Sequence, residues 1–459
     1  MDGPTYQQLL LENQQLREQV ARLQQTNIDL QKRLTDLERS AKRQAAPFSK
    51  GPPKPKPKKP GRKRGEQHGK HGHRPPPPVA EIDETLDAPL PGTCPDPNCG
   101  GRVVEDGTDT QYQTEIPRQP IHREFTIHCG HCETCGKKVR GRHPLQTSDA
   151  TGAAASQLGP DAQATIVDLN KRAGMSHGKI ADTFSRAFGI SLTRGVCAQV
   201  IMRAAGILMP AYEMIKERIK LSNHLTPDET GWRIGGHPAW LHCWVGDRGA
   251  TLYAIDPKRS ADVLENIIGI DWSGSMTHDG FSSYDRFEDV VHQQCVDHAL
   301  RRARGLVDKQ HGTARLFPHQ VIKRSTEALR LRDPLDAANA DIDRRGLIYE
   351  DYTQRMLDLT KRNRPNELNN RFAKHLHKHG SSWFLFLIDP TIPATNHRAE
   401  QALKTPIVNR KVWGGNRTLA GCRAQAVLCS VLQTCNKLSI DVFDYLSNAF
   451  RGNIAPLFA

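Results

Sequence analysis

The feature that most constrains the fold is a succession of short apolar runs, separated by turns, between residues 224 and 307. Short runs of apolar residues indicate strands, and longer stretches with one apolar face indicate helices. The pattern predicts three strands, a helix, a strand, a helix, a strand and a closing helix. The first strand ends near Asp228, and the later elements cover residues 238–245, 251–255, 260–268, 275–278, 282–287, 292–295 and 298–307.

Acidic residues follow two of these strands. Asp228 closes the first strand, and Asp279 follows the fourth. This is the element order of a ribonuclease-H-like domain, in which the first and fourth strands are neighbours, so the two carboxylates are expected side by side. Open α/β sheets commonly carry their active groups at such strand ends.

A third acid, Glu400, is expected on the first turns of a helix that Thr395 or Asn396 would cap. The stretch at 309–379 is charged and helical in pattern, and we interpret it as an insertion into the sheet domain. Residues 383–388 are then expected to resume the domain as a buried strand. The predicted catalytic domain spans residues 221–410.

Three carboxylates brought to one place indicate divalent-metal chemistry on a phosphodiester. Two metal ions roughly 3.5–4 Å apart stabilise charge on the attacking and leaving oxygens, and magnesium prefers carboxylate ligands. Asp228, Asp279 and Glu400 are therefore the expected catalytic residues and the expected ligands of Mg²⁺ or Mn²⁺. Glu229 is the alternative to Asp228, although neighbouring residues of a strand point to opposite faces.

Leucines recur at intervals of seven in the N-terminal segment, at Leu9, Leu16, Leu23, Leu30 and Leu37. The other core positions of the same heptads are Tyr6, Asn13, Val20, Asn27 and Leu34. Asparagine at such a position favours a parallel, in-register dimer. Residues 1–45 are therefore predicted to form a leucine-zipper coiled coil that makes a homodimer. The alternative is an amphipathic helix that folds back on its own chain.

The chain has 64 lysines and arginines against 50 aspartates and glutamates, a net charge of +14. This charge favours a polyanionic partner, nucleic acid first and an anionic membrane surface second. Residues 46–88 are predicted to be a disordered, basic, Pro-rich linker. It is either a solvated spacer or a sequence-independent phosphate contact through Lys58, Lys59, Arg62, Lys63 and Arg64. No apolar run could cross a bilayer, so a cytoplasmic, nucleoid-associated protein is expected.

Five of the eleven cysteines lie within residues 94–135. Thiols of a cytosolic protein stay reduced, so this cluster indicates a metal rather than disulfides. Residues 89–145 are predicted to hold one structural zinc between two pairs that each precede a glycine, Cys94 with Cys99 and Cys132 with Cys135. The second pair has alternatives in Cys129 with Cys132 and in the nearby His128 and His131. Unliganded thiols are the remaining alternative.

Residues 155–220 are predicted to be helical. One helix covers residues 161–171, a second opens at Ser176 and ends at Gly189, and a third begins near Arg194. A helix, a short glycine-containing turn and a second helix are the spacing of a helix-turn-helix, so Arg194 is a candidate DNA contact. Plain packing of helices is the alternative.

A basic run, Asn409-Arg410-Lys411-Val412-Trp413-Gly414-Gly415, follows the helix of Glu400. Arg410 and Lys411, with Lys404 one turn beyond Glu400, are candidate contacts to DNA phosphates, and a basic surface loop is the alternative. Residues 424–438 show one clean apolar face. Together with residues 439–450 they are predicted to form a helical cap, in a C-terminal segment that spans 411–459.

Several of these motifs together resemble the transposase of the insertion-sequence-66 family, a group of bacterial DDE transposases. The motifs are Asp228 to Trp232, His278-Asp279-Gly280 with Tyr284, Cys295-Val296-Asp297-His298, Asn396 to Glu400, and Asn409-Arg410-Lys411. The resemblance extends over nearly the whole chain and implies that Asp228, Asp279 and Glu400 are the catalytic triad. It also implies that Cys295 and His298 form a Cys-x2-His element that packs near the site. The chain departs from the family in having Val296 where tryptophan is common, Lys404 where arginine is common, and a wider first cysteine pair.

The resemblance implies a metal-dependent transposase that binds the inverted-repeat ends of an insertion sequence as a dimer. Water activated by metal would free 3′-hydroxyls, which would then attack target DNA, with accessory transposition proteins as further partners. One alternative is a catalytically inactive, DNA-binding derivative that acts as a repressor. The other is a site-specific nuclease without strand transfer. The expected fold is multidomain α+β, with a ribonuclease-H-like core preceded by coiled coil, zinc module and helix-turn-helix-like helices.

Overall fold

The computed structural model describes residues 6–42, 77–89, 91–106, 108, 110–113, 120–146, 158–362 and 364–458. The chain forms two compact units, residues 1–117 and residues 118–459, and each is described here by itself. The five candidate phosphate contacts of the basic linker, Lys58, Lys59, Arg62, Lys63 and Arg64, lie outside the described residues.

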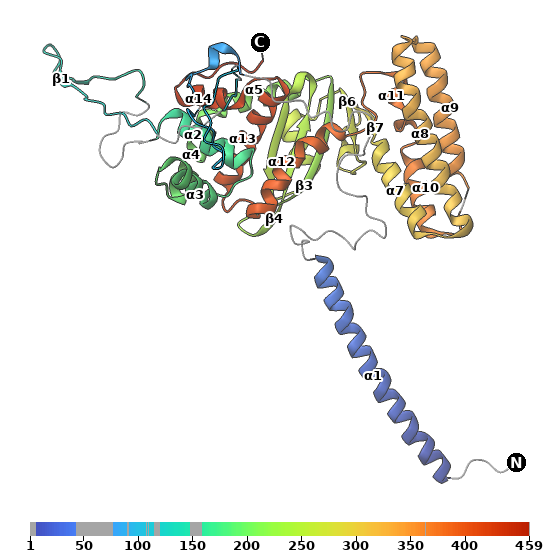
Figure 1. Ribbon diagram of the computed structural model, residues 1–459. Coiled ribbons are helices and arrows are strands. Elements are labelled where there is room, and N and C mark those ends of the chain that lie inside the picture. Colours follow the sequence, from blue (N-terminus) through green and yellow to red (C-terminus); the bar gives the residue numbers. More distant parts are fainter. Residues whose placement is uncertain are drawn as a thin grey trace. The chain divides into compact units, whose positions relative to one another are not determined.

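In the first unit the heptad stretch is one continuous helix, α1 (Tyr6–Lys42), as Figure 1 shows. The predicted helix is thus confirmed. Leu16, Leu23 and Leu30 are each more than half exposed along it, so the apolar seam has no partner within the described residues of this unit. A short 3-10 turn, η1 (Val79–Glu81), and an isolated bridge between Thr93 and Arg102 follow.

The second unit begins with a small hairpin of β1 (Cys129–His131) and β2 (Lys138–Arg140). Helices α2 (Pro160–Lys171), α3 (His177–Phe188), α4 (Arg194–Ile207) and α5 (Met209–Lys220) follow. The three helices predicted in this region are confirmed as α2, α3 and α4. The Ser176 and Thr193 side chains cap the starts of α3 and α4, and Gly189 ends α3 with φ 68°. The fourth, α5, was not predicted.

A five-stranded mixed sheet forms the centre of this unit. Its strands are β3 (His224–Ile234), β4 (His237–Val245), β5 (Thr251–Asp256), β6 (Ser275–His278) and β7 (Val291–Gln294), in the spatial order β5-β4-β3-β6-β7. β3, β4 and β5 are antiparallel neighbours, whereas β6 runs parallel to β3 and β7 parallel to β6. Helix α6 (Ala261–Ile268) connects β5 to β6.

The structure corrects three sequence predictions. The first strand does not end near Asp228, because β3 continues to Ile234 as a hairpin with β4. The stretch at 282–287 contains only a 3-10 turn, η4 (Tyr284–Arg286). The prediction of a buried strand at 383–388 was wrong. Residues Leu385–Ile388 form a helical turn, α11, which is buried against other helices. A short apolar run cannot by itself distinguish a strand from a buried helical segment.

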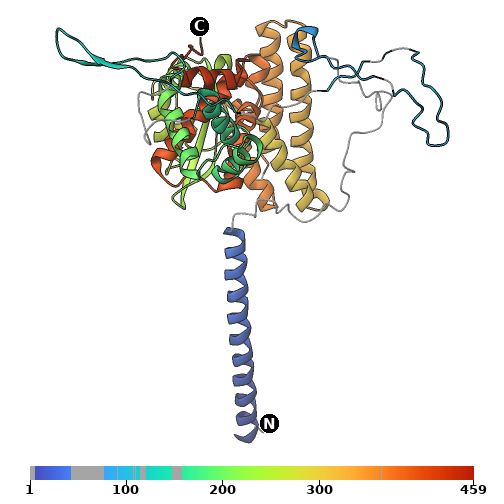
Figure 2. The same ribbon diagram turned by 60° about the vertical axis from the view of Figure 1, so that its left-hand side comes forward.

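The insertion is helical, as predicted. It contains α8 (Leu316–Ala337), α9 (Ile342–Thr360) and α10 (Glu367–Lys378). These helices pack with α7 (Val296–Lys309) and α11 around a core of their own, and both ribbon views show them side by side (Figures 1 and 2). The helical insertion thus follows α7 in the chain and packs against it, and α7 comes directly after β7.

The last three helices return to the sheet. α12 (His397–Trp413) packs on β3 and β4, as Figure 1 shows. α13 (Leu419–Lys437) and α14 (Val442–Phe450) share one core with α2–α5, β5 and α6. No single described helix is long and apolar enough to cross a membrane, and the α4–α5 pair passes that test only when its two bent members are joined.

Candidate active site

The strand register places two of the three predicted acids at one level of the sheet. Leu225 of β3 pairs with Met276 of the parallel strand β6. Asp228 and Asp279 each lie three residues beyond that pair. By this register they come at the same level of β3 and β6, although Asp228 lies inside its strand and Asp279 just after the end of its own.

Asp228 faces α12. It pairs across the hairpin with Cys243, whose side chain packs with Ala399 and other residues of α12, and cross-strand partners lie on one face of a sheet. Its Oδ1 accepts the Glu229 backbone N–H at 2.9 Å. Burial, followed by the negative charges of Glu229, Asp279 and Glu400, raises the pKa of Asp228 to about 7. The charges of the other three carboxylates thus all act on Asp228.

The Asp279 carboxylate is oriented by its own turn. Its Oδ1 accepts the backbone N–H of Phe281 at 3.0 Å. Gly280 adopts φ +86°, and a Cβ at that position would lie 2.8 Å from the Gln294 Oε1 and 3.2 Å from the His375 Cε1. Only glycine suits this conformation and this space.

Two histidines hold the same turn from inside. The Gly280 N–H donates to the Nδ1 of His278 at 3.1 Å, and the Nε2 of His278 lies 3.0 Å from the Nδ1 of His292. The Nε2 of His292 lies 2.9 Å from the Phe287 carbonyl oxygen, which can only accept. Both rings must therefore be neutral, with Nε2 protonated, for every contact to pair one donor with one acceptor. Burial also lowers the pKa of His278 well below its usual value.

Glu400 lies on the first turn of α12, as predicted, and Asn396 occupies the N-cap position without a side-chain capping bond. Its carboxylate forms an ion pair with Arg301 of α7 and lies 3.7 Å from the His298 Nε2. Arg301 also contacts Asp297 at 3.1 Å. The third acid is thus tied to the helix that follows β7.

The alternative acid, Glu229, is engaged on the opposite face. It pairs with His242 rather than Cys243. Its Oε1 contacts Arg259 at 2.7 Å, its Oε2 accepts the Tyr284 hydroxyl at 2.6 Å, and its side chain is only 2% exposed. Glu229 therefore has three protein donors, counting both nitrogens of Arg259 that reach it.

Two comparisons bear on this arrangement. The family model described as Transposase IS66 family matches residues 155–424, more than half of the chain. The chain belongs to this family. It is also similar to the uncharacterized protein y4hP of Sinorhizobium fredii (strain NBRC 101917 / NGR234), at 23% identity over 410 residues that cover 79% of this chain and 70% of that protein. Family membership gives the chain a transposase role, with DNA as the implied partner.

DDE transposases generally use divalent metal, and the donor types of this IS66-family transposase suit it. Asp228, Asp279 and Glu400 supply hard carboxylate oxygens. Next to Glu400, the His298 Nδ1 and both polar atoms of the Asn396 amide are buried without a protein hydrogen-bond partner among the described residues, and such groups commonly bind ordered water. As placed, no three or more His, Cys, Asp or Glu side chains in the described ranges stand close enough to hold a metal ion.

Of the other predicted residues of the IS66-family transposase, some make contacts within the protein and some are exposed to solvent. Cys295 is buried, and its Sγ accepts the Asn396 N–H at 3.4 Å, so it joins the start of α7 to the start of α12. Arg410 donates to the Gly231 carbonyl and lies 3.3 Å from the Thr230 hydroxyl, so it fastens α12 to β3. The candidate DNA contacts Lys404, Lys411 and Arg194 are exposed.

Each predicted cysteine pair sits in a turn of its own, and the two turns belong to different units. In one, the Cys94 N–H donates to Gly101 O at 2.8 Å. In the other, the Cys132 N–H donates to Lys137 O at 2.9 Å, and hydrogen bonds from the Cys135 and Thr134 backbones hold the pKa of the Cys132 thiol below its usual value. Cys129 lies instead within β1. The zinc ligands stay a prediction.

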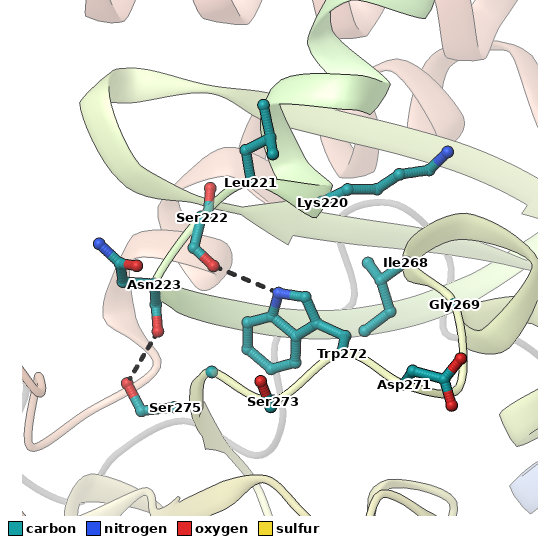
Figure 3. A pocket seen from close by; sticks show the side chains of 11 residues that line it. Lys220, Leu221, Ser222, Asn223, Ile268, Gly269, Asp271, Trp272, Ser273 and Ser275 are labelled. Carbon is teal, nitrogen blue, oxygen red and sulfur yellow. Dashed lines mark hydrogen bonds between the residues drawn. The ribbon is translucent and has the colours of Figure 1, made fainter.

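A cavity of about 740 Å³ lies at the other end of the parallel strands, among residues that precede β3 and β6 (Figure 3). Trp272 forms its wall and donates to the Ser222 carbonyl at 3.2 Å. None of the four carboxylates discussed above lines it. The acids therefore do not occupy this hollow.

Proposed function

We propose that the chain is a DDE transposase that cuts DNA at the ends of an insertion sequence and joins those ends to a target. The catalytic residues are Asp228, Asp279 and Glu400. The observation that carries this proposal is the placement of the three acids. Asp228 and Asp279 come at the same level of β3 and β6 by register, and Glu400 lies on α12, which packs on the face of β3 that carries Asp228. Burial and the charges of Glu229, Asp279 and Glu400 also raise the pKa of Asp228. Carboxylates that converge from separate elements, one of them with a raised pKa, are a common mark of catalytic sites.

The sheet supports a ribonuclease-H-like core. Its order β5-β4-β3-β6-β7 puts the first, fourth and fifth strands parallel and the first three antiparallel. This brings the elements of the first two acids together at the centre of the sheet. The third acid comes from α12, which packs on the same face of β3 as Asp228.

The chemistry follows from the donor set. When bound, two Mg²⁺ or Mn²⁺ ions stabilise the charge on the attacking and leaving oxygens and activate water or a 3′-hydroxyl. Asp228 and Asp279 would hold these ions from adjacent strands, and Glu400 would complete the set after releasing Arg301. The Phe281 N–H and the histidine pair keep the Asp279 carboxylate oriented for that task.

DNA and a second copy of the chain would meet other parts of the molecule. The exposed Lys404 and Lys411 continue α12 beyond Glu400, and Arg194 opens α4, so these cations are proposed phosphate contacts. Arg410 is bonded to β3, and its first role is to hold α12 in place. The exposed leucines of α1 support a parallel homodimer.

The test is cleavage and joining on DNA that carries the ends of the element encoding the chain, with magnesium. The unaltered protein is compared with Asp279→Asn and Glu400→Gln. Asp271→Asn serves as the matched control, because Asp271 is exposed and lines the distant cavity. Cutting and joining by the unaltered protein and the control, with binding but no cutting by the other two, is the expected result.

Other outcomes separate the alternatives. Nicked DNA without joined products would favour a nuclease. Equal binding and no cutting by all four proteins, with candidate accessory proteins added, would favour a DNA-binding repressor and overturn the enzymatic proposal.

A further inference from the structure

Arg259 is held from one edge by a buried carboxylate. Its Nε and one terminal nitrogen lie 2.9 Å and 2.7 Å from the Oε1 of Glu229. The other oxygen of Glu229 accepts the Tyr284 hydroxyl at 2.6 Å. Because Glu229 is only 2% exposed, it has little freedom to leave Arg259 for another partner.

The same guanidinium lies over two aromatic rings. The Cζ of Arg259 lies 4.6 Å from the ring centroid of Trp240 and 4.0 Å from that of Phe281. These contacts add cation–π attraction and restrict the movement of the group. An arginine fixed in this way loses little conformational entropy when it binds a ligand.

Part of the Arg259 side chain still reaches solvent. It is 35% exposed, although Glu229 and two aromatic rings contact its head group. Its hydrogen bonds to Glu229 use Nε and one terminal nitrogen. The second terminal nitrogen contacts no acceptor in the part of the chain that the structure describes, so its N–H groups are available to a ligand.

Contacts link this guanidinium to the segments of two proposed catalytic acids, although Glu229 points to the face of β3 opposite to Asp228. Phe281, whose ring lies against Arg259, donates its N–H to Asp279. Glu229, which holds its edge, follows Asp228 in β3. DNA that approaches this acidic site is repelled unless cations at its rim attract its phosphates.

We propose that Arg259 binds a DNA backbone phosphate next to the scissile one, with Glu229, Trp240 and Phe281 as its rigid support. The proposal rests on the proposed function and deepens it, because it names a residue that positions the substrate. A guanidinium suits this task better than an ammonium, because its planar fork can bind a phosphate through two parallel N–H bonds.

The experiment measures binding of end DNA in EDTA and cleavage of the same duplexes in magnesium. Arg259→Gln and Arg259→Lys are compared with Arg286→Gln. Arg286 is a matched control, because it is 57% exposed and pairs with Asp262 and Glu265 of α6, so its loss removes one nearby cation. Methylphosphonates, which remove the charge of one phosphate, are placed singly around the cleavage position.

One methylphosphonate position is expected to weaken binding by the unaltered protein about tenfold, as the loss of a charge-assisted hydrogen bond would. At that position Arg259→Gln should show less than about a twofold effect, because the contact is already lost. Its binding should also depend less on salt, with a slope smaller by about 0.9 in log K against log salt. Arg286→Gln should keep both properties of the unaltered protein.

The failures are distinguishable. If the unaltered protein neither binds nor cuts end DNA, the proposed function is wrong and this inference falls with it. If it cuts, and Arg259→Gln keeps its full methylphosphonate profile and salt slope, this inference alone is overturned. Thermal unfolding of each variant checks folding. If Arg259→Gln unfolds, Arg259→Lys provides the test. It keeps the charge, so we expect the methylphosphonate at the contacted position to weaken its binding less than it weakens binding by the unaltered protein.

Discussion

Asp228 of β3 and Asp279, just after β6, each lie three residues beyond the paired Leu225 and Met276 of these parallel strands. The charge of Asp279 acts on Asp228, and no cationic side chain pairs with Asp228 among the residues that the structure describes. Its Oδ1 accepts the adjacent backbone N–H of Glu229. The resulting strain is electrostatic, and it can be measured before any DNA is added.

The first prediction concerns the pH dependence of stability in EDTA. The pKa of Asp228 rises from 3.8 to about 7 in the folded chain, so the folded state binds the extra proton between these values. The bound proton stabilises the folded state fully below about pH 3.8, and this effect is lost as the pH rises through 7. Its contribution to the free energy of unfolding is at most on the order of 4 kcal/mol. Asp228→Asn should therefore flatten the fall in melting temperature between pH 5 and 8.5. An unchanged slope in that variant would contradict the raised pKa.

Gly280→Ala tests the turn that carries Asp279. The new methyl group would lie 2.8 Å from Gln294 and would force φ +86° on a residue with a Cβ. A cost of roughly 2–4 kcal/mol follows from backbone strain and overpacking, and cleavage should be lost. Gly305→Ala, inside α7 with nothing near its position, should instead stabilise by about 0.5–1 kcal/mol. Urea unfolding of both variants measures the difference, and equal effects would refute this account.

Local signals explain how much of this fold could be predicted from the sequence. Hydrophobic periodicity and capping residues such as Ser176 and Thr193 act within one or two turns, and they located most helices and strands. Long-range pairing decided the rest. β3 runs past Asp228 because β4 pairs with it, and residues 383–388 are not a strand because no neighbouring strand receives them.

The same division applies to the candidate site. Asp279 and Glu400 lie where local signals placed them, just after β6 and on the first turn of α12, whereas Asp228 lies inside β3. Their catalytic role stays a prediction. The partners of the acidic residues could not be predicted, because Arg259 is 30 residues from Glu229 and Arg301 is 99 residues from Glu400. The spacing of Asp297, His298 and Arg301 on one face of α7 was the only available signal for the second pair.

Arg301→Gln tests the ion pair on Glu400. In EDTA-treated protein this pair competes with a metal for the carboxylate, so its removal should strengthen Mn²⁺ binding. Half-exposed pairs contribute about 0–1 kcal/mol, which limits the gain to roughly fivefold in calorimetric titration. Arg355→Gln, which breaks a similar pair with Asp351 in the insertion, should change nothing. Weaker Mn²⁺ binding by Arg301→Gln would show that Arg301 supports the site instead of competing for it.

The zinc prediction can be tested by metal analysis of purified single variants. The Cys132 thiol accepts backbone hydrogen bonds that lower its pKa, as a metal-binding thiolate requires, whereas Cys129 lies in a strand. Cys132→Ser should therefore lower the zinc content from one ion per chain, and Cys129→Ser should leave it unchanged. Loss of zinc in Cys129→Ser alone would select the alternative pair.

The zipper prediction concerns the exposed leucines of α1. Leu16 and Leu23 are 54% and 69% exposed in the single chain, and burying such a seam against a second copy is the main driving force of a coiled coil. The double variant Leu16→Lys and Leu23→Lys should be monomeric by sedimentation at concentrations where the unaltered protein is a dimer. Gln25→Lys, on the outward face of the same heptad, should stay dimeric. A dimer in the double variant would place the contact elsewhere, and the seam would then have to cover another part of its own chain.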